Sequence, residues 1–385
     1  MTSRERLMAI LNREKKVDRV AWSPLIDGYF MSSLPPGKDI IDIFREINAN
    51  VMERNVYTWE STIEKLILPR RSDESSESYI GESYVGNGVS VSKEETTDEK
   101  GTLQTVKYKI PGYKLTGRFL FTKGSPYIPY PIEPLIKTIE DLEAYEYIKK
   151  KEKYIPNYSN FVEEDKRIGD TGIATDSGPE SPIQQLVTVL IGVEKFYTIF
   201  FVDYLDKLIS LMDVMHEKNL ECYEIIANSP ADVVIDYENT STTLVSPEIY
   251  KRYSLPCIND YADILHGRNK IYLTHRCGKL KNLLVFLREG RDDGITEISP
   301  APTGDLNIWD AWEALPNKIV MGGIDPTFLT QWSPEQIKEY VRVILMNVRG
   351  GERLIIGTAD ATPKDAKIEN LKAVGECIIE EGELT

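Results

Sequence analysis

The sharpest chemical signal in the sequence is His275-Arg276-Cys277-Gly278, which follows an apolar run at residues 270–275. Side chains two residues apart in an extended segment point to the same face, so His275 and Cys277 lie together. Imidazole nitrogen and thiolate sulfur are donors that tetrahedral zinc prefers. The same spacing also occurs where a histidine and a cysteine are simply packed in the core. The pair is therefore a candidate zinc site only if it lies at a strand end that faces carboxylates.

Carboxylates do follow other apolar runs of the chain. Asp236 and Glu238 form a second same-face pair, and the run at 293–298 carries Glu297. A buried carboxyl group of the first pair is suited to donate a proton or to complete a metal shell, so we expect Asp236 and Glu238 to be catalytic. The alternative is that Asp236 caps a helix or pairs with Arg276.

Three further residues follow the expected strand ends. Asp27 and Tyr29 come after the run at 19–26, and Asp325 precedes Pro326 after the run at 318–323. We take Asp27, Tyr29 and Asp325 as candidate substrate-binding residues. An aspartate before proline is most often a turn or cap residue, which is the competing interpretation of Asp325.

Short apolar runs recur along the chain and alternate with helical patterns. Runs that are apolar on both faces are typical of buried parallel strands. Helix starts are marked by Thr2 with Glu5, by Ser246 and by Ser333. Eight strand–helix units predict an α/β fold, a (β/α)8 TIM barrel, with a doubly wound open sheet as the alternative. The eight runs lie near residues 19–26, 52–58, 171–176, 231–237, 270–275, 293–298, 318–323 and 353–357.

One stretch, at about residues 75–130, breaks the alternation. Val106 and Tyr108 alternate with polar residues, as in a half-buried strand, and Thr97–Gly101 supplies a turn. We expect a small β-hairpin insertion after the second strand, which either shapes the barrel mouth or only covers a barrel face. Apart from this β-rich insertion, residues 1–385 are expected to form a single barrel domain.

Composition narrows the class of protein. The net charge of −15 argues against binding nucleic acid or an anionic membrane surface. The first sixteen residues carry charges throughout, and no window has the roughly 18 apolar residues of a membrane span, so we expect a cytoplasmic protein without a secretory signal. The four cysteines are scattered and are expected to stay reduced. A small molecule or a protein partner remains, and a homo-oligomer is open.

Several segments together resemble the uroporphyrinogen decarboxylase-like superfamily. They are Thr2–Arg6 with Val17–Val20, Leu244–Glu248 with Leu255-Pro256, His275–Gly278, Gly322–Asp325 and Asp360 to Lys372. Their order along the whole chain is more specific than any single motif. The resemblance implies a TIM barrel and one of two chemistries.

Decarboxylases of this superfamily carry an arginine-rich segment after the first strand, which holds a polycarboxylate porphyrinogen. Here that place reads Ser23-Pro-Leu-Ile-Asp-Gly-Tyr-Phe30, without arginine. The resemblance therefore favours the other branch, the methyltransferases that work with a separate corrinoid protein and are similar to the methyltransferase I of O-demethylases.

These methyltransferases imply a zinc site on His-x-Cys with a third ligand, often cysteine, after the last strand. The matching position here is Asp360, so the resemblance gives His275, Cys277 and Asp360 as metal ligands, with Glu238 as another source of an oxygen ligand. A shell with fewer thiolates leaves a stronger Lewis acid, which suits an ether, alcohol or amine donor better than a thiol acceptor. The departure from cysteine also leaves open a weak or empty site.

The cobalamin-type corrinoid is expected on a partner protein. Chains that ligate cobalt through histidine commonly show Asp-x-His-x-x-Gly, and none of the three histidines has aspartate two places before it. We therefore expect an enzyme that moves a methyl group from a small methylated donor, such as a methoxylated aromatic compound, to the Co(I) corrinoid of a partner. The alternatives are a decarboxylase, a methylcorrinoid:thiol methyltransferase and a catalytically silent barrel.

Overall fold

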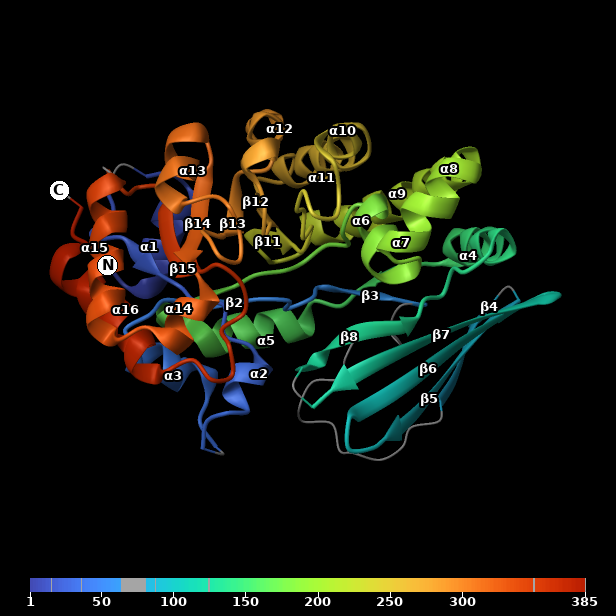
Figure 1. Cartoon of the computed structure of the whole chain (residues 1–385), viewed down its shortest axis with the longest axis horizontal. Coiled ribbons are helices and arrows are strands. Elements are labelled where there is room, and N and C mark those ends of the chain that lie inside the picture. Colours follow the sequence, from blue (N-terminus) through green and yellow to red (C-terminus); the bar gives the residue numbers. More distant parts are fainter. Residues whose placement is uncertain are drawn as a thin grey trace. The chain divides into compact units, whose positions relative to one another are not determined.

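The chain folds into two compact units. The first comprises Met1–Thr58, Tyr158–Pro179 and Ile226–Thr385, and the second comprises Trp59–Asn157 and Glu180–Ile225 (Figure 1). The structure, a computed structural model, describes residues 1–14, 16–35, 37–63, 81–86, 88–123, 125–348 and 350–384, without the side chains of 81–86 and 125–128. One domain over 1–385 stays a prediction, because two compact units can belong to a single domain.

Eight parallel strands form the centre of the first unit, at the places that the apolar runs predict. One sheet has the order β1-β15-β14-β13-β12-β11, and β10 pairs with β2. The strands are β1 (Ala21–Trp22), β2 (Val51–Glu53), β10 (Gly172–Ala174), β11 (Val233–Asp236), β12 (Ile271–His275), β13 (Gly294–Ile298), β14 (Ile319–Ile324) and β15 (Leu354–Thr358).

Backbone hydrogen bonds join the two sheets at both of their edges. The amide of Asp176, just after β10, donates to the carbonyl of Val233 (3.1 Å), and the amide of Ile235 donates to the carbonyl of Asp176 (2.9 Å). At the other edge, the amide of Asn50, before β2, donates to the carbonyl of Trp22 in β1 (2.7 Å). The eight strands therefore close into a ring, which confirms the TIM barrel over the doubly wound sheet.

Helices follow the strands of this unit. The capping box of Thr2 with Glu5 is present, and Ser246 and Ser333 cap the helices that they were predicted to start. The helices are α1 (Ser3–Leu11), α2 (Gly28–Met31), α3 (Ile40–Glu46), α5 (Ser159–Ile168), η2 (Gly169–Thr171), α10 (Pro247–Ile249), η5 (Tyr250–Ser254), α11 (Leu255–His266), η6 (Lys281–Leu283), α12 (Leu284–Glu289), α13 (Ile308–Ala314), α14 (Pro326–Gln331), α15 (Pro334–Asn347) and α16 (Ile368–Glu381).

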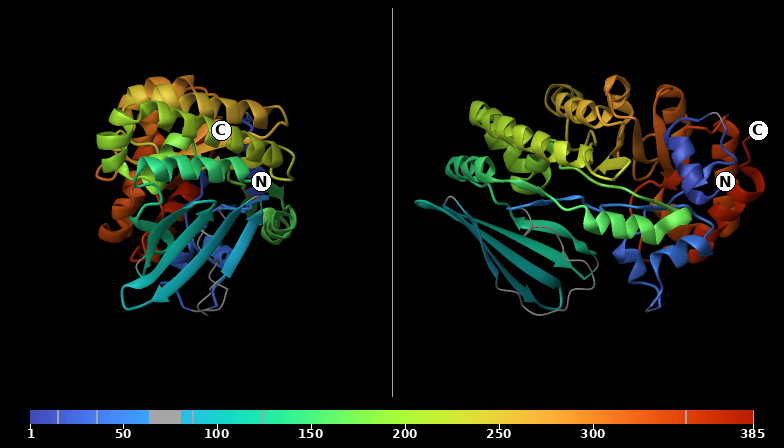
Figure 2. Two further views of the ribbon diagram at one scale, coloured as in Figure 1. Left: turned by 90° about the vertical axis from the view of Figure 1, so that its right-hand side faces the viewer. Right: turned by 180° about the vertical axis from the view of Figure 1, so that it is seen from behind.

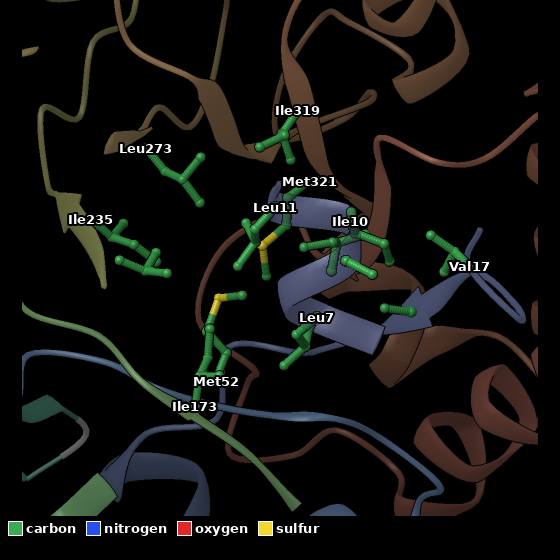
Figure 3. Packing of buried hydrophobic residues seen from close by; sticks show 14 residues of the cluster. Leu7, Ile10, Leu11, Val17, Met52, Ile173, Ile235, Leu273, Ile319 and Met321 are labelled. Carbon is green, nitrogen blue, oxygen red and sulfur yellow. The ribbon is translucent and has the colours of Figure 1, made fainter. Parts of the chain in front are cut away.

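The apolar core of the barrel shows which face of each strand points inward. Leu7 and Ile10 of α1 are fully buried against side chains from the strands, among them Ile235 of β11 and Leu273 of β12 (Figure 3). Because successive side chains of a strand alternate between its two faces, the residues two positions after Ile235 and Leu273 also point inward. These residues are Tyr237 and His275.

The second unit holds the insertion between β2 and β10. Figure 2 shows five of its strands side by side in one antiparallel sheet of order β4-β5-β6-β7-β8. The strands of the unit are β3 (Trp59–Ser61), β4 (Gly81–Gly86), β5 (Val89–Thr97), β6 (Gly101–Ile110), β7 (Tyr113–Thr122), β8 (Ser125–Glu133) and β9 (Tyr154–Pro156). Its helices are α4 (Ile139–Lys151), α6 (Pro182–Gln185), η3 (Leu186–Leu190), α7 (Val193–Lys195), η4 (Phe196–Phe200), α8 (Phe201–Asp203) and all but the last two residues of α9 (Leu205–Ala227).

The predicted hairpin is present in this sheet, but the insertion is larger than one hairpin. Strands β5 and β6 pair around the Asp98–Gly101 turn, and Val106 and Tyr108 are fully buried, as their alternation predicts. Three more strands extend the hairpin. Strand β4 pairs with β5, β7 pairs along the whole length of β6, and β8 pairs with β7. The first part of the predicted span, residues 75–80, lies outside the described residues. No helix of the described residues is long and apolar enough to cross a membrane.

Candidate metal centre at the strand ends

Three potential ligands meet at the carboxyl ends of two barrel strands. His275 is the last residue of β12, Cys277 follows two positions later, and Asp360 comes two positions after β15. One donor atom of each residue lies within 4.8 Å of the donor atoms of the other two. The structure thus brings together the three residues that the sequence predicted as metal ligands.

Strand geometry explains why His275 and Cys277 share this position. Both continue the inward face of β12 that begins with Leu273 in the barrel core. The amide of Asn239 donates to the carbonyl of His275 (2.9 Å), which holds the end of β12 beside the loop after β11. Gly278 then turns the chain with φ +91°, a conformation that residues with a Cβ rarely adopt.

A buried carboxylate orients the imidazole. Glu297 Oε2 lies 2.7 Å from His275 Nδ1, and both side chains are almost completely buried. Glu297 has φ +59°, and the pairing of β13 with β14 shifts register across it. Such an irregularity re-aims a side chain, here toward the imidazole. With Nδ1 facing the carboxylate, Nε2 is the nitrogen left to bind a metal.

Arg54, just after β2, completes this arrangement. Its Nη1 lies 2.6 Å from Glu297 Oε1, and both groups are buried. Burial alone would raise the pKa of Glu297, but the charges of Arg54 and then His275 lower it to about 2. Burial lowers the pKa of His275, but the charge of Glu297 outweighs it and raises that pKa well above its usual value.

Tyr237 also faces the candidate ligands. Its ring stacks on the His275 ring, with centroids 4.9 Å apart and planes 28° apart. Asn55 Nδ2 donates a hydrogen bond to the Tyr237 hydroxyl oxygen (3.2 Å). Arg54, Asn55 and Tyr237 were not predicted as site residues, although they lie within the apolar runs at 52–58 and 231–237.

The predicted catalytic pair lies elsewhere. Asp236 alternates with the inward-pointing Ile235 and Tyr237, so it faces away from the barrel interior, as does Glu238. The Tyr272 hydroxyl donates to Asp236, and the charge of Arg276 acts on Asp236 as well. Burial and then Glu238 raise the pKa of Asp236 to about 8. The structure thus does not bring Asp236 to the His275 cluster, and a side chain that it contacts is that of Tyr272. Catalysis by Asp236 and Glu238 stays a prediction.

The predicted substrate-binding residues begin helices at the same end of the strands. Asp27 accepts hydrogen bonds from the amides of Tyr29 and Phe30 as the N-cap of α2. Burial raises the pKa of Asp27, whereas the hydrogen bonds from these amides lower it. The pKa is raised overall, and the charge of Asp360 contributes to the rise. Asp325 is fully buried and caps α14, as the competing interpretation holds. Substrate binding by Asp27, Tyr29 and Asp325 stays a prediction.

Comparison with known proteins agrees with this architecture. The family model of uroporphyrinogen decarboxylase (URO-D) matches residues 118–380, more than half of the chain. The chain belongs to the uroporphyrinogen decarboxylase family. A methyltransferase from Methanosarcina mazei has a similar solved structure, with a TM-score of 0.58 and 14% sequence identity over 99% of each chain. At this identity the likeness shows the fold alone. No curated protein sequence matches the chain.

The donor set of this family member fits zinc. A tetrahedral zinc ion spaces its ligand atoms by about 3.5 Å, so donors within 4.8 Å need to approach by only about 1 Å. Nitrogen, sulfur and carboxylate oxygen are all common zinc ligands. The carboxylate of Glu297 behind His275 is the outer-shell partner that metal-bound histidines usually have.

Proposed function

We propose that the protein is a methyltransferase, which moves a methyl group from a small methylated donor to the Co(I) corrinoid of a partner protein. The observation that carries this proposal is the donor cluster of His275, Cys277 and Asp360 with the carboxylate of Glu297 behind the imidazole. It stands at the carboxyl ends of barrel strands, where TIM-barrel enzymes keep their active sites. The fold shared with the Methanosarcina mazei methyltransferase supports the proposal.

The residues at the site indicate what each would do. His275, Cys277 and Asp360 would hold zinc, which when bound supplies a Lewis acid for the oxygen or nitrogen that leaves the methyl group. Only one of the three ligands is a thiolate, which leaves zinc a stronger Lewis acid. Such a zinc ion is better suited to activate an ether or amine methyl donor than to activate a thiol acceptor. Glu297 lies against Nδ1 of the imidazole, so Nε2 would be the nitrogen that holds the metal, and Arg54 balances the charge of Glu297.

Decarboxylation of a polycarboxylate fits these residues less well. Such a substrate needs cationic groups that face it. Arg54 already pairs with Glu297, and Arg276 lies among the carboxylates of Asp236, Glu238 and Asp292 on the outer face of the strands. Both arginines therefore already have carboxylate neighbours within the protein and are not available to bind a polycarboxylate.

The need for a partner rests on the sequence. None of His216, His266 and His275 lies in an Asp-x-His-x-x-Gly motif. We propose that the corrinoid arrives on a separate protein, which offers Co(I) as the methyl acceptor. The donor class that we propose is a methoxylated aromatic compound or a similar ether or amine.

Metal analysis is the first test. We expect about one zinc per chain in the wild type and loss of that zinc in Cys277→Ser and His275→Ala, because each removes a ligand. Cys257→Ser is the matched control, since Cys257 lies in α11 and donates to the Tyr253 carbonyl (3.4 Å). The zinc-loaded protein is then assayed for methylation of a Co(I) corrinoid protein by methoxylated aromatics. Full zinc in Cys277→Ser would refute the ligand assignment. A wild type without zinc would favour the catalytically silent barrel, and zinc without methyl transfer would contradict the proposed reaction.

A further inference from the structure

We propose that Tyr237 binds the leaving oxygen of the methyl donor, by donating a hydrogen bond from its hydroxyl group as negative charge develops there. This inference rests on the proposed function and narrows its donor class. It assigns to Tyr237 the stabilising role that was expected of Asp236 and Glu238.

The position of Tyr237 on its strand is the first argument. Ile235 lies in the barrel core, and Tyr237, two residues on, points to the same interior at the carboxyl end of β11. Its ring rests on the imidazole of His275, so its hydroxyl belongs to the surroundings of the candidate metal ligands. Tyr237 is also partly exposed, whereas Asp236 and Glu238 are fully buried, so a small molecule at the strand ends can reach it.

The direction of the hydrogen bonds is the second argument. Asn55 Nδ2 donates to the Tyr237 oxygen, so the oxygen is the acceptor in this contact (3.2 Å). The Arg54 guanidinium, held in its charged form by Glu297 (2.6 Å), also lies next to the tyrosine oxygen. A hydroxyl whose oxygen accepts keeps its own hydrogen for another acceptor, and donation by its neighbours strengthens that hydrogen bond.

The backbone holds Asn55 in this orientation. Asn55 has φ +58°, a left-handed conformation that asparagine tolerates better than most residues. Tyr57 donates to Asn55 Oδ1 (3.4 Å), which leaves the amide nitrogen of Asn55 as the group that faces Tyr237. The donor to Tyr237 is thus positioned before a substrate arrives, as electrostatic stabilisation requires.

The bond between the methyl carbon and its oxygen breaks, and its electron pair stays on the oxygen. The methyl carbon bonds to the Co(I) of the partner's corrinoid, which supplies the electron pair of the new bond and is formally oxidised. The oxyanion accepts the hydrogen bond of Tyr237 as it forms and takes a proton from water after the transfer.

The same reasoning favours ethers over quaternary ammonium donors. An ether leaves as an alkoxide or phenolate, which gains from a preorganised hydrogen-bond donor. A quaternary ammonium compound leaves as a neutral amine, which carries no negative charge for Tyr237 to stabilise. The donor class that matches Tyr237 is therefore a methyl ether, such as a methoxylated aromatic compound.

The test compares zinc-loaded wild type with Tyr237→Phe, which keeps the stacked ring and removes only the hydroxyl. The probes are anisole and 4-nitroanisole with a Co(I) corrinoid protein. Losing an oxyanion donor costs roughly 10²–10³-fold in kcat. We expect a loss of this size for anisole and a much smaller loss for 4-nitroanisole, because the nitro group already spreads the negative charge. Tyr261→Phe, in α11, is the control for loss of a buried tyrosine hydroxyl, and its rates should equal those of the wild type.

A second measurement does not depend on turnover. Binding of 4-nitrophenolate, followed by its absorbance, should weaken about tenfold or more in Tyr237→Phe, because a hydrogen bond to a charged group is lost. Equal rate losses for both ethers, or unchanged 4-nitrophenolate binding, would overturn the role of Tyr237 while methyl transfer by the wild type stood. Methyl transfer by the wild type from tetramethylammonium but from neither ether would also overturn it. A zinc-loaded wild type that transfers from no donor would overturn the proposed function itself.

Discussion

Glu297→Gln separates the metal-binding role of the site from its contribution to stability. The Glu297 carboxylate lies between His275 Nδ1 (2.7 Å) and Arg54 Nη1 (2.6 Å), without exposure to solvent. Glutamine has nearly the same shape and keeps one oxygen, but it carries no charge. The substitution therefore weakens the hold on the imidazole and leaves the Arg54 cation without its counter-charge.

Two free energies change, and the second is larger. Loss of an outer-shell partner typically reduces metal affinity by about 10–100-fold, or about 1.4–2.7 kcal/mol. Removing one partner of a buried ion pair costs about 3–5 kcal/mol of folding free energy, because the remaining charge stays buried. We expect Glu297→Gln to lower the stability of the zinc-free protein more than it lowers the free energy of zinc binding.

A second substitution tells these effects apart. Arg54→Met with Glu297→Gln removes the unpaired cation, and Arg54 Nη2 already lies 3.8 Å from the sulfur of Met321, beside apolar core. The double variant should regain most of the lost stability but not the lost zinc affinity. Glu238→Gln is the matched control, since this buried carboxylate lies on the outer face and should affect stability alone.

The assay is competition for zinc with a chelator, beside urea unfolding of the zinc-free proteins. Wild-type zinc affinity in Glu297→Gln would refute the role of Glu297 behind a metal ligand. Recovery of zinc affinity in the double variant would show that Arg54, and not the charge of Glu297, controls the imidazole.

Two further predictions concern the strand ends. Burial and then Glu238 raise the pKa of Asp236 to about 8, above the unfolded value of about 4, so the folded state keeps a proton that the unfolded state loses. The contribution of Asp236 to stability should fall as the pH rises from about 4 to about 8, so the urea midpoint of the wild type should decline relative to that of Asp236→Asn over this range. A constant difference between the two midpoints would contradict the assignment. Gly278→Ala should destabilise the protein by about 1–3 kcal/mol, because its φ is +91° and its Cβ would lie 2.9 Å from Ser241 Oγ. An unchanged urea midpoint would show that this turn relaxes.

The sequence could predict what depends on local spacing. His275 and Cys277 are two residues apart at the end of an apolar run, so their common face follows from strand geometry. The start of α1 at Thr2 follows from its capping box, and the turn between β5 and β6 from Asp98–Gly101. The meeting of these ligands with Asp360 needed the resemblance to a family, because it depends on how distant strands close into a barrel.

Other site residues depend on backbone irregularities that the sequence does not reveal. Glu297 reaches His275 through a positive φ and a shift in strand register, and regular alternation would not predict that direction. Asn55 reaches Tyr237 through another positive φ. Both residues have side chains that are common in ordinary loops, so their types alone gave no signal for these contacts.

The direction of Asp236 could not be predicted for a different reason. The run Val233-Val-Ile-Asp236 is apolar on both faces, since one face meets the barrel core and the other meets the helices. Alternation therefore cannot tell which face is inside. The decisive information is that Ile235 packs in the core beneath α1, which turns Asp236 outward and Tyr237 inward.

At the ends of β11 and β12, the residues of the candidate site lie on the inner face, and residues that hold the backbone in place lie on the outer face. On the outer face, Arg276 is fully buried, donates to Thr274 (2.9 Å) and Thr240 (3.1 Å), and lies over the ring of Tyr250. On the inner face lie the candidate ligand His275 and the ring stacked on it. Because Arg276 stands between the two candidate ligands in the chain, its contacts fix the backbone from which both side chains project. Substitutions on the outer face should therefore lower stability first, whereas removing the hydroxyl of Tyr237 should alter the reaction and leave the fold intact.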